Sequence, residues 1–219
     1  MTKYDFIKDY WKEKLIKHSS AHITLADTML DDSTRNLLKE VGLPIILPEE
    51  GVTSFLPFNH LSKINTTYQE FYIVGDVSAN LSGVRLLGIE VQSGAIYTIR
   101  KTRDQSTLCS FANDSLYQFI YCLAHYNILQ EEDNKRVKEG YKETATQARK
   151  EYEEFKQKLI EIDKSALPEH NTGAYWNHIL FNIRTAVESI EDDEKEGPYP
   201  PLGDDEDRFL DISREDLPF

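Results

Sequence analysis

Few residues of this chain could do chemistry, and a histidine pair near the N-terminus comes first. His18 and His22 are four residues apart, a spacing that on a helix puts both imidazoles on one face and could begin a zinc site. A zinc site needs three or four protein ligands, and the remaining histidines are scattered. They are His60, His125, His170 and His178. We interpret the histidines as surface or core residues and expect no metal site.

Sequence patterns for covalent or phosphate chemistry are absent. The chain contains no G-x-S-x-G nucleophile elbow, no P-loop and no G-x-G-x-x-G segment. Its two cysteines, Cys109 and Cys122, stand among apolar residues, which is typical of buried thiols in a reducing compartment; a disulfide between them is the alternative. We expect no catalytic residue and no cofactor. An enzyme whose site is assembled from distant segments stays the least favoured alternative.

Carboxylates are the most concentrated ionisable groups, and they gather near the C-terminus. The formal net charge is −13, and residues 188–219 alone carry −10, which leaves −3 for the preceding 187 residues. Such a segment repels nucleic acid and anionic lipid and attracts a basic protein. Adjacent carboxylates such as Asp192 and Asp193 are surrounded by like charge, so we interpret them as a solvated run and not as an acid–base pair. The run could also serve solubility alone.

The sheet that must position any site is predicted between residues 71 and 126. Short apolar runs separated by glycine turns lead into one helix, the pattern of an antiparallel meander closed by a helix. The expected strands are 68–74, 84–91, 95–99 and 107–111. Turns are predicted at Gly75-Asp76 and Ser93-Gly94.

Helices are predicted before and after this sheet. The helix that closes the meander has apolar residues at positions i, i+3, i+4 and i+7, which should lie on the sheet. These residues are Leu116, Phe119, Ile120 and Leu123. The other helices are expected at 4–17, 33–41, 143–161 and 175–190. Residues 44–63 are interpreted as a long loop with one short strand near 54–57, and residues 131–140 as a mobile linker.

These elements favour an α+β fold with a central, mostly antiparallel sheet flanked by helices at both chain ends. We expect a single domain over residues 1–190 and an acidic segment, extended or partly disordered, over 191–219. No run of about 18 apolar residues exists, so no membrane-spanning helix is expected. Residues 1–17 are charged throughout, unlike a signal peptide, which predicts a cytoplasmic protein.

Several segments, taken in order, carry a family resemblance. They read RNLLKEVGLP, FYIVGD, LLGIEVQSGAIYTI, FANDSLYQFIYCLAHY, and EIDKSAL with YWNHILFNI. In this order they resemble the SUKH superfamily of bacterial immunity proteins, and within it the fourth SUKH family, predicted to inhibit nucleic-acid-deaminase and related toxins. The resemblance covers roughly residues 33–187. The acidic segment after Ile190 departs from it, because family members commonly end soon after their last helix.

The resemblance implies a non-catalytic protein of a polymorphic or contact-dependent toxin system. It would bind a cognate toxin domain, of nuclease or nucleic-acid-deaminase type, and block it by steric and electrostatic occlusion. Toxins that act on nucleic acid tend to carry basic grooves, so an acidic partner would associate faster. The alternative is a regulatory or scaffold binding module on the same fold, which would bind several partners weakly.

The expected contact surface consists of the acidic segment and two loops. The carboxylates that should pair with Lys and Arg of the toxin are Asp192, Asp193, Glu194, Glu196, Asp204, Asp205, Glu206 and Asp207. The loops are expected at 44–63 and 78–83. Neither nucleic acid nor a membrane is an expected partner, and the oligomeric state is left open.

Overall fold

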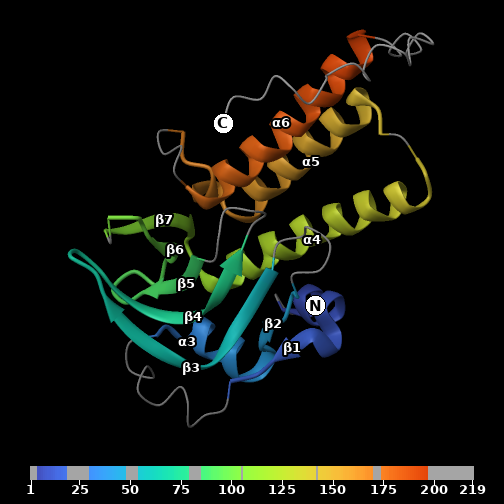
Figure 1. The fold of residues 1–219 in the computed structure, drawn as a ribbon. Helices are drawn as coiled ribbons and strands as arrows, with labels where there is room; N and C mark the ends of the chain where they lie inside the picture. Colours follow the sequence, from blue (N-terminus) through green and yellow to red (C-terminus); the bar gives the residue numbers. More distant parts are fainter. Residues whose placement is uncertain are drawn as a thin grey trace, which may run out of the picture.

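The computed structural model describes residues 4–18, 30–47, 54–78, 85–104, 106–141, 143–169 and 174–196. Within these ranges a five-stranded antiparallel sheet carries helices from both ends of the chain (Figure 1). The predicted α+β class with a mostly antiparallel sheet is therefore confirmed.

The strands of the main sheet lie side by side in their chain order, β3-β4-β5-β6-β7. They are β3 (Ser54–Asn65), β4 (Glu70–Ser78), β5 (Arg85–Glu90), β6 (Ile96–Lys101) and β7 (Thr107–Asn113). Each neighbouring pair is antiparallel, as expected when consecutive strands are joined by short connections. Near the N-terminus, β1 (Leu15–Ile16) pairs with β2 (Leu43–Pro44) in a separate two-stranded sheet.

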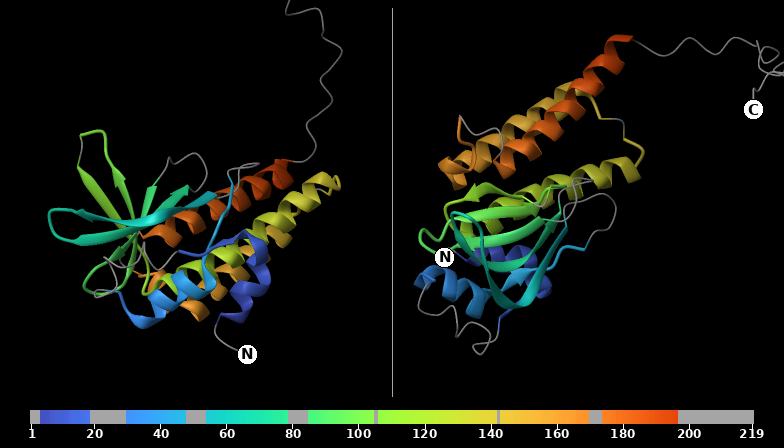
Figure 2. Two further views of the ribbon diagram at one scale, coloured as in Figure 1. Left: turned by 90° about the horizontal axis from the view of Figure 1, so that it is seen from below. Right: turned by 60° about the vertical axis from the view of Figure 1, so that its left-hand side comes forward.

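The helices divide into an N-terminal and a C-terminal group (Figures 1 and 2). The first group is α1 (Asp5–Trp11), the 3-10 turn η1 (Lys12–Lys14), α3 (Asp32–Asn36) and the π-helical turn η2 (Leu37–Val41). The second group is α4 (Leu116–Lys138), α5 (Ala145–Ile162), the 3-10 turn η3 (Lys164–Ala166) and α6 (Tyr175–Glu196). In the described part of the chain, no helix combines the length and apolarity needed to cross a membrane.

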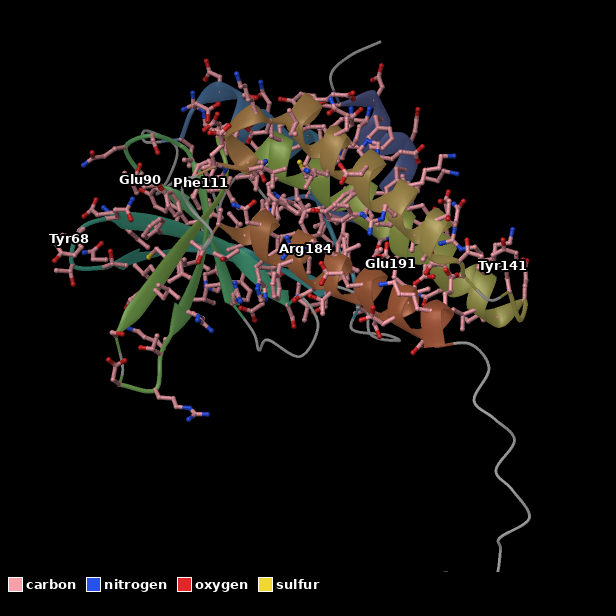
Figure 3. All side chains as sticks on the ribbon, turned by 90° about the horizontal axis from the view of Figure 1, so that it is seen from above. Tyr68, Glu90, Phe111, Tyr141, Arg184 and Glu191 are labelled. Atoms are coloured by element: carbon pink, nitrogen blue, oxygen red, sulfur yellow. The ribbon has the colours of Figure 1, made fainter. Side chains whose placement is uncertain are left out.

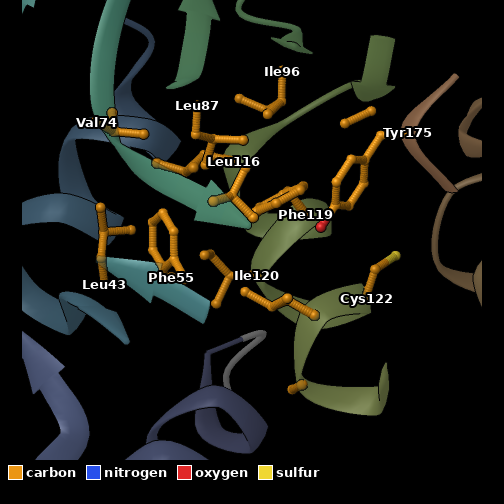
Figure 4. Close-up of a cluster of buried hydrophobic side chains, with 14 of the residues drawn as sticks. Leu43, Phe55, Val74, Leu87, Ile96, Leu116, Phe119, Ile120, Cys122 and Tyr175 are labelled. Atoms are coloured by element: carbon orange, nitrogen blue, oxygen red, sulfur yellow. The ribbon is translucent and has the colours of Figure 1, made fainter. Parts of the chain in front are cut away.

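Helix α4 covers one face of the sheet with the predicted stripe. Its four stripe residues, Leu116, Phe119, Ile120 and Leu123, are all fully buried. The Phe119 ring centroid lies 6.5 Å from that of Phe55 in β3 and 5.8 Å from that of Tyr175 in α6 (Figure 4). Burying a phenylalanine contributes about 1.5–3 kcal/mol, so this residue helps to hold sheet, α4 and α6 together.

A buried polar cluster fixes the C-terminal helices against β7. Asn113 donates from Nδ2 to Asp163 Oδ2 at 2.8 Å and accepts from Trp176 Nε1 at 2.8 Å. The same Asp163 oxygen accepts from the backbone N–H of Asp114 at 2.9 Å. Since buried polar groups need partners, these bonds allow few other orientations of α6 on the sheet.

The short strand predicted near residues 54–57 is confirmed as the start of the 12-residue strand β3, but the loop predicted around it is wrong over residues 58–63, where β3 continues. Proline made a loop the natural interpretation, because it cannot donate to a strand ladder. β3 is the edge strand of the main sheet, where it pairs with β4, and its only other described pairing is an isolated bridge between Phe55 and Ile46. The register between β3 and β4 shifts between Pro57 and Ser62. An edge strand with an irregularity tolerates the missing N–H.

The turn predicted at Gly75-Asp76 is also wrong, because β4 runs through both residues. The register with β5 shifts between Ile73 and Gly75, and a Cβ on Gly75 would lie 2.6 Å from the carbonyl oxygen of Leu56. The absence of a side chain at Gly75 therefore allows β3 and β4 to approach closely. In contrast, the turn at Ser93-Gly94 is confirmed, with Gly94 at a φ of +75°.

Two helix boundaries differ from the prediction because tertiary contacts decide them. The expected helix over residues 4–17 ends at Trp11, since Leu15 and Ile16 pair with β2 instead. The expected linker over residues 131–140 is helical up to Lys138, where α4 ends. There Arg136 donates to both carboxylate oxygens of Glu151 in α5, at 2.6 and 2.7 Å.

The last helix extends six residues beyond its predicted end at Ile190, to Glu196. The boundary predicted between folded domain and extended segment therefore does not coincide with the helix end. The added residues, EDDEKE, suit a helix: Lys195 pairs with Asp192 one turn earlier at 3.0 Å, and Lys195 is a cation in the last turn.

Candidate partner-binding surfaces

The acidic end of α6 is partly occupied by contacts within the chain. Lys195 Nζ donates to Asp192 Oδ1 at 3.0 Å, and Glu194 Oε1 accepts the backbone N–H of Ala145 at 3.0 Å. Ala145 is the first residue of α5, where unpaired N–H groups favour a negative charge. Asp193 has no hydrogen-bond partner in the described part of the chain and is exposed.

A second carboxylate of this helix also holds α5. Glu191 Oε1 accepts from Arg149 Nε of α5 at 2.8 Å. The arginine side chain is 62% exposed and the glutamate 22%, so solvent screens the pair and its energy is small. Its geometric effect is to hold the ends of α5 and α6 together, as Glu194 does.

The structure places only some of the predicted toxin-contact carboxylates. Asp192, Asp193 and Glu194 lie on the last turns of α6, where Asp193 is free to meet a partner. The side chain of Glu196 and the carboxylates Asp204, Asp205, Glu206 and Asp207 lie outside the described residues. Of the two predicted contact loops, residues 48–53 and 79–83 likewise lie outside the described ranges.

The second face of the main sheet is apolar, although no described helix packs on it. We call it the open sheet face. It carries Leu56, Phe58, Ile64, Phe71, Ile73, Leu86, Tyr97, Ile99, Cys109 and Phe111, assigned by contact and strand register. The three central side chains, Phe71, Ile73 and Ile99, are buried, and the others are partly exposed.

The centre of the open sheet face is closed by packing across β5. Gly88 has no side chain, and a Cβ there would lie 2.8 Å from Ile99 Cδ1 and 3.2 Å from Phe71 Cβ. Side chains from β4 and β6 therefore meet above the glycine. The Tyr97 ring lies edge-on to Phe71 and Phe111, at centroid distances of 5.5 and 5.6 Å. A continuous aromatic row crosses the face from β4 to β7.

Three charged residues share this face. Glu90 accepts from the N–H and hydroxyl of Ser93, both at 2.6 Å, and Lys101 donates to Thr107 Oγ1 at 2.7 Å. Asp76 differs, because no described residue supplies it with a hydrogen bond or a positive charge. Burial raises the pKa of its carboxyl group above the ordinary value.

Two hairpins extend the open sheet face beyond the helices (Figures 2 and 3). Tyr68 lies at the tip of the β3–β4 hairpin and is 93% exposed. A hollow of about 610 Å³ lies between this tip and the β6–β7 hairpin, lined among others by Asn65, Lys101 and Cys109. The sheet thus offers both a hollow and an apolar surface.

The described residues offer little for catalysis or metal binding. No group of three or more His, Cys, Asp or Glu side chains in the described ranges could hold a metal ion. His18 is buried and lies after β1, outside any helix, and His22 lies outside the described residues. The structure therefore does not place the two imidazoles on one helix face. Burial raises the pKa of the Cys122 thiol, which keeps it protonated and unreactive.

The open sheet face was missed by sequence reasoning, although a signal was present. A sheet with one solvated face alternates apolar and polar residues, whereas FYIV at 71–74 is apolar at every position. We interpreted such runs as core. Their alternate residues in fact line two different surfaces, with Tyr72 and Val74 facing the helices and Phe71 and Ile73 the open side.

Comparison with known proteins gives a family match. The model of the SUKH-4 immunity protein family matches residues 18–182. No curated protein and no solved structure matches the chain. The matched range contains the whole main sheet together with α4 and α5. Because it spans well over half of the sequence, the chain belongs to the SUKH-4 immunity protein family.

Proposed function

We propose that this chain binds a cognate bacterial toxin domain and neutralises it by covering its surface, without turnover. The family match over residues 18–182 is the observation that carries this proposal. The partly exposed apolar face and the carboxylates at the end of α6 are compatible with protein binding. In this mechanism the bound protein excludes the substrate from the toxin.

The proposed toxin class is a nuclease or a nucleic-acid deaminase. Enzymes that act on nucleic acid bind a polyanion, so their substrate grooves are basic. The net charge of −13 and the exposed carboxylate of Asp193 would steer such a groove towards this chain. We propose that the encounter takes place in the cytoplasm, where the nucleic-acid substrate would be present.

Co-expression with the toxin domain encoded by the adjacent gene tests the function. We expect growth to be rescued and the two proteins to co-purify as a stable complex. The same toxin with its catalytic residue replaced is the control, because it should still bind while causing no growth defect. Failure of the wild-type chain to bind this toxin contradicts the proposal, and weak binding to several unrelated proteins would support a scaffold module instead.

A further inference from the structure

We propose that the open sheet face is the surface that binds the toxin, through apolar contacts and through a toxin Lys or Arg that pairs with Asp76. This inference rests on the proposed function and adds the surface and the chemistry of the partner. All five strands contribute apolar side chains to the face, and its cluster contains no helix residue. Large exposed apolar patches on folded proteins mark interaction sites.

The partly exposed residues of the face have the composition of an interface core and stand on a buried apolar support. Its buried centre, Phe71, Ile73 and Ile99, is rigid, because these side chains pack on one another over Gly88. Around this centre stand partly exposed aromatic residues, Tyr97 among them. Tyrosine and phenylalanine are enriched at interface cores, where they bury large areas at a low entropic cost.

Asp76 makes the open sheet face favour a partner that presents a positively charged side chain. It lies in register with Leu56 of β3 and Leu86 of β5, so apolar side chains flank it on both sides. A carboxylate removed from water without a partner costs free energy. A cationic side chain from a bound protein would supply a charge-assisted hydrogen bond and remove this cost. Asp76 is half-buried, and a destabilising group that a fold retains at such a position is typical of a functional site.

Charge also favours a basic partner over a second copy of this chain. Two copies, each with a net charge of −13, repel one another, and a symmetric contact through this face would bury a second unpaired Asp76. A basic toxin is attracted by the same charge. We therefore assign the face to the toxin and treat self-association as an outcome of the test.

A matched pair of leucine variants separates this face from the rest of the surface. Leu56 on the edge strand β3 is 39% exposed, and Leu108 on the edge strand β7 is 42% exposed. Strand register places Leu56 with Asp76 on the open sheet face, whereas Leu108 pairs with Arg100 and points to the opposite side. The two leucines thus differ in face but hardly in exposure.

The probe is the purified, catalytically inactive toxin domain encoded by the adjacent gene, and binding is measured by calorimetry. We expect Leu56→Asp to weaken binding at least about tenfold, because it places a charge in a desolvated contact. Leu108→Asp should stay within about twofold of the wild type. Asp76→Lys should weaken binding by at least as much as Leu56→Asp. Thermal unfolding confirms that each variant is folded.

The outcomes distinguish the inference from the proposed function. If the wild-type chain does not bind the toxin, the proposed function fails and the inference falls with it. If the wild type binds and both Leu56→Asp and Asp76→Lys bind equally well, only the inference is overturned. A similar loss in Leu108→Asp overturns it too. Finally, a wild-type dimer that Leu56→Asp dissociates in sedimentation would assign the face to self-association and overturn the toxin assignment.

Discussion

At the scale of single residues, Asp76 combines partial burial, apolar neighbours and an unpaired charge. Desolvation raises its pKa in the folded protein above the ordinary value of about 3.9. The native state therefore holds this proton to a higher pH than the unfolded chain does. Linkage then requires that Asp76 lowers the free energy of unfolding as the pH rises through its folded pKa.

We predict that Asp76→Asn is more stable than the wild type at neutral pH, by at most about 1 kcal/mol because water still reaches the group. The gain should shrink as the pH falls through the folded pKa and then the unfolded pKa, and it should vanish below about pH 3, where Asp76 is protonated in both states. Urea unfolding of the wild type and of Asp76→Asn at several pH values measures this stability difference.

Asp104 provides a control of opposite sign. Hydrogen bonds from Thr102 and Ser106 lower the pKa of its carboxyl group, so the ionised form favours folding above the ordinary pKa. Asp104→Asn should therefore give no gain in stability at neutral pH. A wild type more stable than Asp76→Asn at neutral pH would show that Asp76 has a stabilising partner, contrary to its assignment as an unpaired group.

At the scale of elements, the acidic end of α6 acts as a brace for α5. Glu194 accepts the first N–H of α5, and Glu191 pairs with Arg149 on the same helix. These contacts mean that part of the acidic run stabilises the fold. A deletion beginning at residue 188 would remove this brace together with any contact to a toxin.

We predict that Glu194→Gln lowers stability by about 0.5–1 kcal/mol, because a negative charge near the N-terminus of α5 is lost. Amide hydrogen exchange should accelerate in the first turn of α5 and stay unchanged in β5. Asp193→Asn is the matched control, because Asp193 carries an equal charge at the same helix end and is exposed, with no hydrogen bond to the described residues of α5. This variant should leave exchange unaltered. Equal exchange in the two variants would argue against the brace.

The helices and strands also show which elements can be predicted from local sequence alone. The helical stripe of α4 and the turn at Ser93-Gly94 follow from local spacing and from a glycine with positive φ, and both were predicted. β3 was predicted only at its start, because Pro57 opposes the continuation of a strand unless the strand lies at an edge, and edge position is not local information. Gly75 was mistaken for a turn, because sequence does not distinguish a turn glycine from one that admits a neighbouring strand.

At the scale of the whole molecule, charge and apolar surface have separate roles in the proposed binding. Residues 197–219 carry a net charge of −5 out of −13, and this charge acts over the distance of a Debye length, about 10 Å at 0.1 M salt. Long-range charge alters association rates, whereas desolvated contacts control dissociation.

We predict that deleting residues 197–219 slows association with the toxin several-fold at low salt and leaves the dissociation rate nearly unchanged. The difference between full-length and truncated chains should disappear near 1 M salt, where the Debye length is about 3 Å. Stopped-flow kinetics over a salt series measures both rates. A faster dissociation of the truncated chain at all salt concentrations would place direct contacts in the deleted segment.

Apolar periodicity, motif order and composition are local or additive properties, so the fold class, the family and the concentration of charge could be predicted without a structure. Which apolar residues form the core and which form a surface depends instead on contacts between distant segments. Phe71 and Tyr72 are adjacent and similar in character, yet one lies on the open sheet face and the other beneath the helices. The physical reason is that a buried strand exposes alternate residues to two environments, and the elements packed on each face come from distant parts of the chain. The same holds for the chemistry: the unpaired charge of Asp76 and the contact between Glu194 and α5 exist only once distant segments have been brought together.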